Sequence, residues 1–147
     1  MNTRPIEQRD IESILTIQSV SPEVSQWTMW DYNRVAQGEM AGWVAVSNDE
    51  VFGFLVARRI GSDVEILNFA VQPDFRRCGV GEALLQSALA WGAELNAERA
   101  LLEVRASNYA ALQFYERRGF AVTGRRLRYY TAPIEDALLL TAEIRRS

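Results

Sequence analysis

The sequence predicts an α/β domain built on one mixed, mostly antiparallel sheet of about seven strands, flanked by about four helices. Strand-like segments at 43–47, 51–59 and 65–71 follow one another across short turns, which is typical of an antiparallel meander. A long helical pattern over 80–95 then leads to a strand at 100–105. A connection through a helix predicts that strands 65–71 and 100–105 run parallel.

Length, charge and composition indicate a single globular domain and argue against a nucleic-acid-binding or membrane protein. With 147 residues, 48% hydrophobic and 24% charged, a single domain over 1–147 with a real core is expected. The net charge of −3 argues against general affinity for nucleic acid. No apolar run approaches the roughly 20 residues of a membrane span, and the N-terminus lacks a signal-peptide core. One cysteine, Cys78, cannot form an internal disulfide. We expect a cytoplasmic protein with neither a nucleic-acid nor a membrane partner.

The chain contains no histidine, and all 16 of its basic residues are arginines. Histidine-based zinc sites, catalytic triads and Schiff-base chemistry are therefore excluded. Acid–base work is left to Glu, Asp, Tyr or water, and no metal is expected.

The N-terminal part predicts one edge strand and two helices. Residues 3–6 form the strand, since proline is tolerated at an edge. Asp10 is a fair N-cap for the first helix. Thr28 and Asp31 form an approximate capping box for the second, which ends near Gly38. The inward-facing positions are Ile11, Ile14, Leu15 and Gln18 in the first helix and Met29, Tyr32 and Val35 in the second.

The remaining elements follow from turn and cap residues. Asn48-Asp49 predicts a hairpin turn, and Gly53 marks a bulge or a close backbone approach. Ser107-Asn108 caps a helix that Gly119 ends, and its inner face carries Ala111, Leu112 and Tyr115. One strand starts at 120–122, and the last covers 136–144.

The most informative stretch is the turn between strand 65–71 and helix 80–95, with the run Arg-Arg-Cys-Gly-Val-Gly at 76–81. The first N–H groups of a helix lack internal partners and carry partial positive charge. Glycine lets a phosphate approach the main chain, and Arg76 and Arg77 add charge. A Walker loop is excluded because Glu82 follows the second glycine, and a dinucleotide fingerprint fits poorly because position 84 is Leu84.

The pattern Arg-x-x-Gly-x-Gly after a strand resembles the pyrophosphate loop of the GNAT N-acetyltransferases, which bind acetyl-coenzyme A (acetyl-CoA). A second pattern, Asn108-x-x-Ala-Leu-x-x-Tyr115-x-x-x-Gly-Phe, is similar to another signature of that family. Three further segments are similar to one subgroup of that family: Asn-Phe-Ala-Val at 68–71, Leu-Glu-Val-Arg-Ala-Ser-Asn at 102–108 and Tyr-Tyr at 129–130. Over roughly residues 43–144 the chain resembles the RimI-type ribosomal-protein alanine N-acetyltransferases.

The resemblance implies the GNAT fold, acetyl-CoA as co-substrate, and transfer of its acetyl group to the α-amino group of an N-terminal alanine of a basic ribosomal protein. It implies Glu103 as general base and Tyr115 as general acid. Residues 20–40 would form one wall of the acceptor site. The residues implied to bind the co-substrate are Phe69, Ala70, Val71, Arg76, Arg77, Cys78, Gly79, Val80, Gly81, Glu82 and Asn108.

The same residues could instead have purely structural roles. Glu103 is two positions from Arg105 and could pair with it, Tyr115 could be a core aromatic, and Asn108 could be only a helix cap. A GNAT acting on another protein N-terminus or on a small amine, and a non-catalytic acyl-CoA sensor, are the alternative functions.

Overall fold

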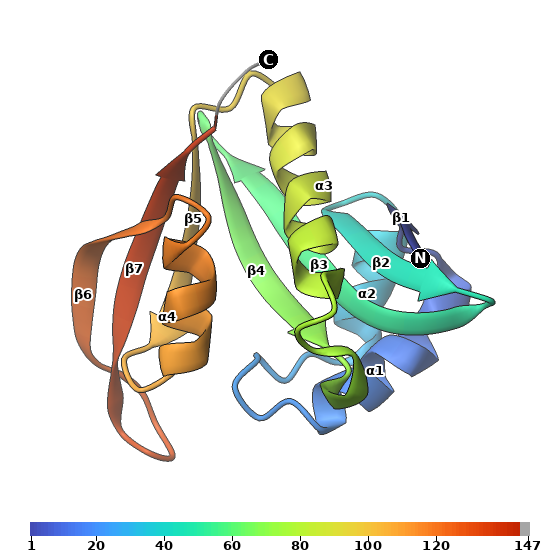
Figure 1. Cartoon of the computed structure of the whole chain (residues 1–147), viewed down its shortest axis with the longest axis horizontal. Coiled ribbons are helices and arrows are strands. Elements are labelled where there is room, and N and C mark those ends of the chain that lie inside the picture. The colour runs from blue at the N-terminus through green and yellow to red at the C-terminus, as the bar shows by residue number, and fades with distance from the viewer. Residues whose placement is uncertain (145–147) are drawn as a thin grey trace.

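The computed structural model describes residues 1–144, so the predicted domain 1–147 includes three residues that lie outside the described part. A seven-stranded sheet has the order β1-β2-β3-β4-β5-β7-β6 (Figure 1). Only β4 and β5 are parallel, and the other neighbours are antiparallel. The strands are β1 (Asn2–Pro5), β2 (Ala41–Ser47), β3 (Glu50–Ile60), β4 (Asp63–Val71), β5 (Arg99–Arg105), β6 (Ala121–Tyr130) and β7 (Glu135–Glu143). The α-helices are α1 (Ile11–Ser19), α2 (Met29–Ala36), α3 (Val80–Glu94) and α4 (Tyr109–Glu116).

The predicted sheet class, element order and parallel pair are confirmed, and one element is longer than its sequence pattern suggested. A strand start was expected at 120–122, and β6 continues to Tyr130. Its residues are mostly exposed, because β6 is the outer strand and pairs only with β7. An outer strand need not alternate between apolar and polar residues, so the pattern that marks half-buried strands is missing.

Two apolar cores lie on opposite faces of the sheet. Helices α3 and α4 cover one face, where Leu84 and Leu85 are fully buried and Tyr115 is largely buried. Helices α1 and α2 cover the other, where Ile14, Ile17 and Tyr32 are buried. In Figure 1, α3 crosses in front of the sheet, and α1 and α2 lie behind it.

A β-bulge in β4 changes which residues face which core. Val56 lies opposite Asn68 but the next residue of β3, Ala57, lies opposite Ile66, so Leu67 is an extra residue in β4. Ile66 belongs to the core beneath α3, whereas Ala70 belongs to the core beneath α1 and α2. After the bulge the even-numbered side chains therefore face α1 and α2.

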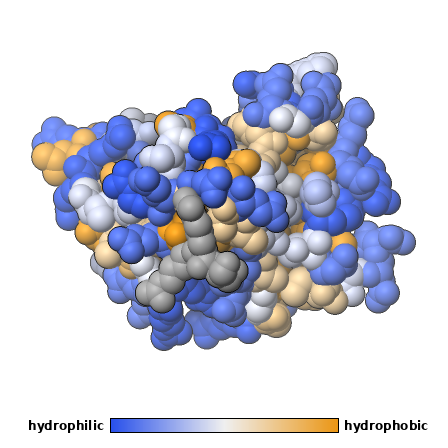
Figure 2. All heavy atoms as spheres, turned by 90° about the horizontal axis from the view of Figure 1, so that it is seen from above, coloured by the Kyte–Doolittle hydropathy of each residue, from blue (hydrophilic) through white to orange (hydrophobic). Residues whose placement is uncertain are grey.

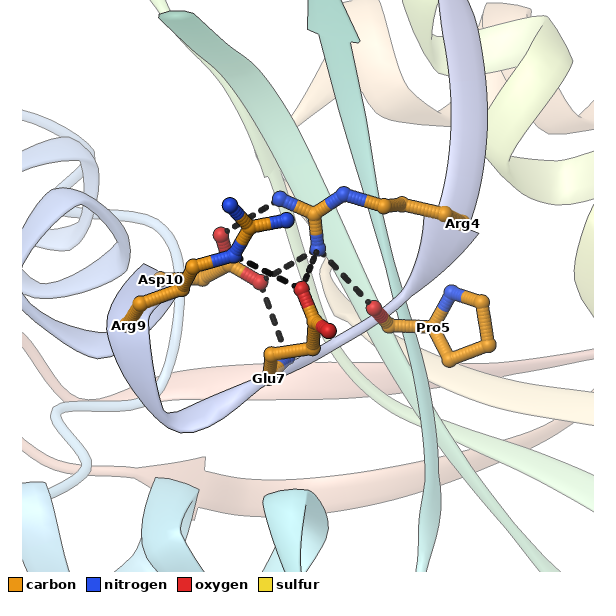
Figure 3. A network of polar contacts seen from close by, with 5 residues as sticks. All are labelled: Arg4, Pro5, Glu7, Arg9 and Asp10. Atoms are coloured by element: carbon orange, nitrogen blue, oxygen red, sulfur yellow. Dashed lines mark hydrogen bonds and ion pairs between the residues drawn. The ribbon is translucent and has the colours of Figure 1, made fainter. Parts of the chain in front are cut away.

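Polar contacts fix the corner between β1 and α1 (Figure 3). Arg4 donates to both carboxylate oxygens of Asp10 at 2.7 and 2.8 Å, and the N–H of Glu7 donates to Asp10 at 2.8 Å. The Asp10 side chain is only 4% exposed. Burial would raise the pKa of Asp10, but the hydrogen bonds from Arg4 and Glu7 outweigh it and hold the pKa below its usual value.

Among residues 1–144, every helix is too short or too polar to cross a lipid bilayer. The end of the molecule viewed in Figure 2 is covered mainly by hydrophilic side chains, with apolar residues between them.

Candidate functional site

The turn between β4 and α3 leaves the N-terminus of α3 open. Gly79 is the N-cap residue, with φ +83°, and no side chain of the described residues caps this helix. A Cβ added at Gly79 would meet nothing within 4 Å, so the space beside the main chain is free. Uncapped N–H groups at the positive end of a 15-residue helix favour an anion at this place.

The charged residues around this turn have different surroundings. Arg76 donates to the Val71 carbonyl at 3.3 Å and lies 3.5 Å from Glu23, so it connects the turn to the loop between α1 and α2. Arg77 is exposed and has no ion-pair partner among residues 1–144. Glu82 lies 3.7 Å from Arg118 at the end of α4, which offsets its negative charge beside the helix end.

Close packing explains the second glycine of the run. A Cβ at Gly81 would lie 3.3 Å from the ring of Phe114 and 3.5 Å from that of Phe69. Gly81 thus lets α3 approach α4 and the end of β4. The substitution Gly81→Val would block the approach of a phosphate to the turn, but it would also disturb this packing. Gly79 is therefore the cleaner position to substitute.

Beyond its first three residues, β4 has one open edge. Its parallel pairing with β5 ends where Glu65 lies opposite Leu101, although β4 continues to Val71 along β3. The two strands diverge from that point, as Figure 1 shows. Main-chain groups at the end of β4 are thus available on the side of β5.

The register with β3 tells which groups these are. The N–H of Gln72 donates to the carbonyl of Phe52 at 2.8 Å. Hydrogen-bonded pairs alternate along an antiparallel ladder, so the main chain of Ala70 points toward β3. The main-chain N–H groups of Phe69 and Val71 point to the open edge.

Glu103 faces the side of the sheet covered by α1 and α2. Its neighbours Leu102 and Val104 belong to the core beneath α3, and side chains alternate along a strand. The Glu103 side chain is 18% exposed, and Oε1 lies 3.4 Å from Nε of Arg126 in β6. Oε2 is buried and has no hydrogen-bond partner among residues 1–144. Such an oxygen can accept a hydrogen bond or a proton from a bound molecule.

The alternative pairing of Glu103 with Arg105 is not formed. Arg105 lies 3.4 Å from Glu135 and stacks over the ring of Tyr130, with 4.3 Å from the guanidinium carbon to the ring centroid. The actual partner of Glu103, Arg126, comes from a strand that is distant in sequence.

Tyr115 is buried in an aromatic cluster and is 7% exposed. Its ring centroid lies 5.3 Å from those of Phe114 and Phe120 and 6.4 Å from that of Phe69. Its hydroxyl has no hydrogen-bond partner in the described part of the chain. Burial raises the pKa of Tyr115 above its usual value. Tyr115 is thus a core aromatic, and its unpaired hydroxyl remains available to a bound molecule.

Asn108 is a helix cap, as expected. Its side-chain oxygen accepts from the N–H of Ala111 at 3.2 Å at the start of α4. The side-chain NH₂ group is not needed for the cap and can still donate to a ligand.

The structure separates the predicted residues by face. Phe69 and Tyr115 lie on the side of α3 and α4, next to the turn 76–82. Glu103 lies on the opposite side, and the diverging ends of β4 and β5 separate the two groups. The arrangement allows a long molecule anchored at the α3 N-terminus to meet a second molecule that arrives from the α1 and α2 side.

Sequence reasoning missed the polar partners on the α1 and α2 face. Asn68, Gln18 and Tyr32 form a buried hydrogen-bonded network beside the open edge of β4. The available signal was a polar residue, Asn68, within an otherwise apolar strand segment. Among residues 1–144, no group of three or more Cys, Asp or Glu is arranged to hold a metal ion.

Comparison with known proteins identifies the family. Residues 9–120 match the model of the Acetyltransferase (GNAT) family. A Bacillus subtilis (strain 168) protein, provisionally named a [ribosomal protein bS18]-alanine N-acetyltransferase, is 32% identical over 96% of this chain and 94% of its own. An N-alpha-acetyltransferase of Sulfurisphaera tokodaii is 30% identical over 92% of this chain and 88% of its own.

A solved structure agrees. The ribosomal-protein-S18-alanine N-acetyltransferase from Escherichia coli superposes with a TM-score of 0.86 at 25% identity, covering 99% of this chain and 95% of that one. Members of the matched family use acetyl-CoA as acetyl donor, which fits an open helix end beside an open strand edge. The chain belongs to the GNAT family of N-acetyltransferases.

Proposed function

We propose that the protein acetylates the α-amino group of an N-terminal alanine of a ribosomal protein, with acetyl-CoA as donor. The observation that carries the proposal is the divergence of β4 from β5 directly beside the uncapped N-terminus of α3. The names of the Bacillus subtilis and Escherichia coli relatives support alanine as the first residue of the acceptor. Such a protein would be modified in the cytoplasm. The acidic net charge of this chain would favour a basic acceptor protein.

On this proposal the turn and the strand edge hold the donor. The pyrophosphate would bind the main chain of 76–82 and the exposed guanidinium of Arg77. The acetyl-pantetheine arm would lie along the open edge of β4 and pair with the main chain around Phe69 and Val71. The NH₂ group of Asn108 would donate to the arm from the side of β5 and α4. Ala70 would line the arm without a main-chain hydrogen bond to it, because the N–H and C=O groups of Ala70 point to β3.

The chemistry requires a free amine. An α-amino group has a pKa near 7.7–8.0, so at neutral pH most of it is protonated and cannot attack. Glu103, whose Oε2 lacks a partner, would accept that proton directly or through water. The amine nitrogen then bonds to the thioester carbonyl carbon, and the second proton that this nitrogen must lose would pass through water to the departing thiolate. The developing oxyanion would accept a hydrogen bond from the N–H of Val71.

The negative charge that develops on the leaving sulfur needs only modest stabilisation. When the C–S bond breaks, the electron pair goes to sulfur, and the Tyr115 hydroxyl would donate a hydrogen bond to it. The raised pKa of Tyr115 makes complete proton transfer unfavourable. Tyr115 would thus stabilise charge rather than supply most of the driving force.

A second candidate acceptor is a different protein N-terminus. The name of the Sulfurisphaera tokodaii relative specifies N-alpha-acetylation without an alanine. The donor side of the site would be the same, and only the contacts on the α1 and α2 face would differ.

A peptide panel tests the proposal. Thiol release from acetyl-CoA would be measured with eight-residue peptides that differ only in their first residue, and with shortened forms down to the dipeptide. The proposal predicts the highest kcat/KM for alanine and a decline on shortening. Equal rates for dipeptide and octapeptide would indicate a small-amine acceptor. Acetyl-CoA binding without thiol release for any peptide would contradict enzymatic N-terminal acetylation.

A further inference from the structure

Two buried carboxamide side chains hold the loop 20–28, which connects α1 to α2. The Asn68 amide donates to the carbonyl of Ser25 at 3.0 Å and accepts from its N–H at 3.2 Å. The Gln18 amide does the same with Trp27, donating at 2.9 Å and accepting at 3.2 Å. Each amide thus pairs with one loop residue in the manner of a neighbouring strand.

Tyr32 joins the two amides. Its hydroxyl donates to the side-chain oxygen of Gln18 and accepts from the side-chain nitrogen of Asn68 at 2.9 Å. Gln18, Tyr32 and Asn68 are 5%, 0% and 4% exposed. A buried polar group without a partner would be costly, so a fully paired network of this kind specifies one arrangement of the loop.

The loop lies beside the open end of β4. Asn68 immediately precedes Phe69, and the bulge at Leu67 turns its side chain toward α1 and α2. Glu23 in the same loop lies 3.5 Å from Arg76 in the turn before α3. The loop therefore borders the end of β4 on the face that also carries Glu103.

We propose that the Gln18–Tyr32–Asn68 network is a positioning device: it holds loop 20–28, part of the region that the family resemblance implies as one wall of the acceptor site, in the single arrangement that binds the first acceptor residues. The inference rests on the proposed function, because it assigns the acceptor to the α1 and α2 face. Asn68 connects loop 20–28 directly to β4, and the residues that follow it in β4 would hold the acetyl group. Donor and acceptor surfaces are thereby held at one distance from each other.

Three variants remove the network without emptying the core. Asn68→Leu is close in volume and removes the bonds to Ser25 and Tyr32. Gln18→Met keeps the chain length and removes the pair with Trp27. Tyr32→Phe keeps the ring contacts with Trp27 and Phe54 and removes only the hydroxyl. Gln86→Met is the matched control, since it makes the same change as Gln18→Met at an exposed glutamine of α3, outside loop 20–28 and the turn 76–82.

The experiment measures steady-state kinetics with acetyl-CoA and an alanine octapeptide, together with amide hydrogen exchange. We expect Asn68→Leu and Gln18→Met to raise the KM for the peptide about tenfold, the worth of one or two hydrogen bonds. The KM for acetyl-CoA should stay within about twofold, and Tyr32→Phe should have an intermediate effect. Exchange at Ser25 should quicken in Asn68→Leu and at Trp27 in Gln18→Met. Gln86→Met should match wild type in every measurement.

The outcomes separate this inference from the proposed function. If wild type acetylates the peptide, and the variants free the loop without changing the peptide KM, the loop is not an acceptor wall. Unchanged exchange at Ser25 and Trp27 would show that the network does not hold the loop. A parallel loss of affinity for both substrates would make the network a support of the fold only. If wild type acetylates no peptide at all, the proposed function fails, and the exchange data still report whether the network holds the loop.

Discussion

Oε2 of Glu103 is the one carboxylate oxygen among residues 1–144 that is buried without a hydrogen-bond partner. Leaving such an atom unpaired costs about 1–3 kcal/mol. The cost is explained if the partner is the amine, or a water that accompanies it, and is present only during turnover. Arg126, at 3.4 Å from the other oxygen, keeps the carboxylate in place without occupying this position.

Glu103→Gln should lower kcat for acetyl transfer about 100-fold, because an amide cannot take the proton that the amine must lose. The dissociation constant of acetyl-CoA, measured by calorimetry, should stay within about twofold, since the proposed donor site lies on the other face of the sheet. Glu143→Gln removes an exposed carboxylate on β7 and serves as control. Wild-type kcat in Glu103→Gln would rule out this residue as the base.

Tyr115→Phe should lower kcat about tenfold, because one hydrogen bond to the leaving sulfur is lost. The melting temperature should not fall, since the hydroxyl has no partner within residues 1–144 and the ring contacts remain. Tyr109→Phe, at an exposed position in the same helix, is the control. A lower melting temperature combined with unchanged kcat would make Tyr115 purely a core residue.

The sequence allowed the positions of these residues to be predicted but not their partners. The strand pattern around Glu103 is local, so its placement in β5 could be foreseen. Its contact with Arg126 depends on how far β6 extends along β7, which no local pattern encoded. The Gln18–Tyr32–Asn68 network was missed for the same reason, because its members come from α1, α2 and β4.

The turn before α3 combines two left-handed residues, Arg77 and Gly79, with a helix that begins without a side-chain cap. The open helix start at Gly79 follows from the glycine run and was predicted, whereas the positive φ of Arg77, 65°, was not. The bulge in β4 was not, because the sequence 63–71 reads as a uniform strand. Its one extra residue is what turns Asn68 toward α1 and α2 while Phe69 faces α3.

Gly79→Ala should weaken acetyl-CoA binding about tenfold, the worth of one hydrogen bond to a charged group, because the strained turn redirects its N–H groups. Gly38→Ala is a matched control. Both glycines have positive φ, +83° and +91°, and at both an added Cβ meets nothing within 4 Å. Each variant should lose about 1 kcal/mol of stability, and only Gly79→Ala should lose affinity. Equal acetyl-CoA affinity in the two variants would mean that the turn is not the binding element.

The contacts of Asp10 at the corner between β1 and α1 should make part of the free energy of unfolding sensitive to acid. The pKa of Asp10 is lowered by folding, so its contribution is fully present above the unfolded pKa near 3.9 and is lost as pH falls through the folded value. Asp10→Asn should reduce the free energy of unfolding by about 2 kcal/mol at pH 7. Urea unfolding between pH 7 and pH 3 should show this difference shrinking below about pH 4. Glu12→Gln, an exposed carboxylate in α1, should show no comparable difference, and a pH-independent gap for Asp10→Asn would refute the assignment.

On the proposed function, the whole molecule would use the two faces of one sheet for two substrates. The face of α3 and α4 presents the anion-binding turn and Tyr115, and the face of α1 and α2 presents Glu103 and loop 20–28. The strands β4 and β5 are paired at one end and apart at the other, so the reacting groups can meet only at the diverging end. The parallel crossover that creates this geometry was predictable from the order of elements. The length over which the two strands stay paired was not.

Residue-resolved amide hydrogen exchange, with and without saturating acetyl-CoA, tests this arrangement most directly. Bound acetyl-CoA should slow exchange at the N–H groups of Phe69 and Val71, which face the open edge of β4. Exchange at Ala70, already directed to β3, should stay unchanged. If Phe69 and Val71 exchange as fast with acetyl-CoA bound as in the free protein, the acetyl-pantetheine arm does not lie along the open edge of β4.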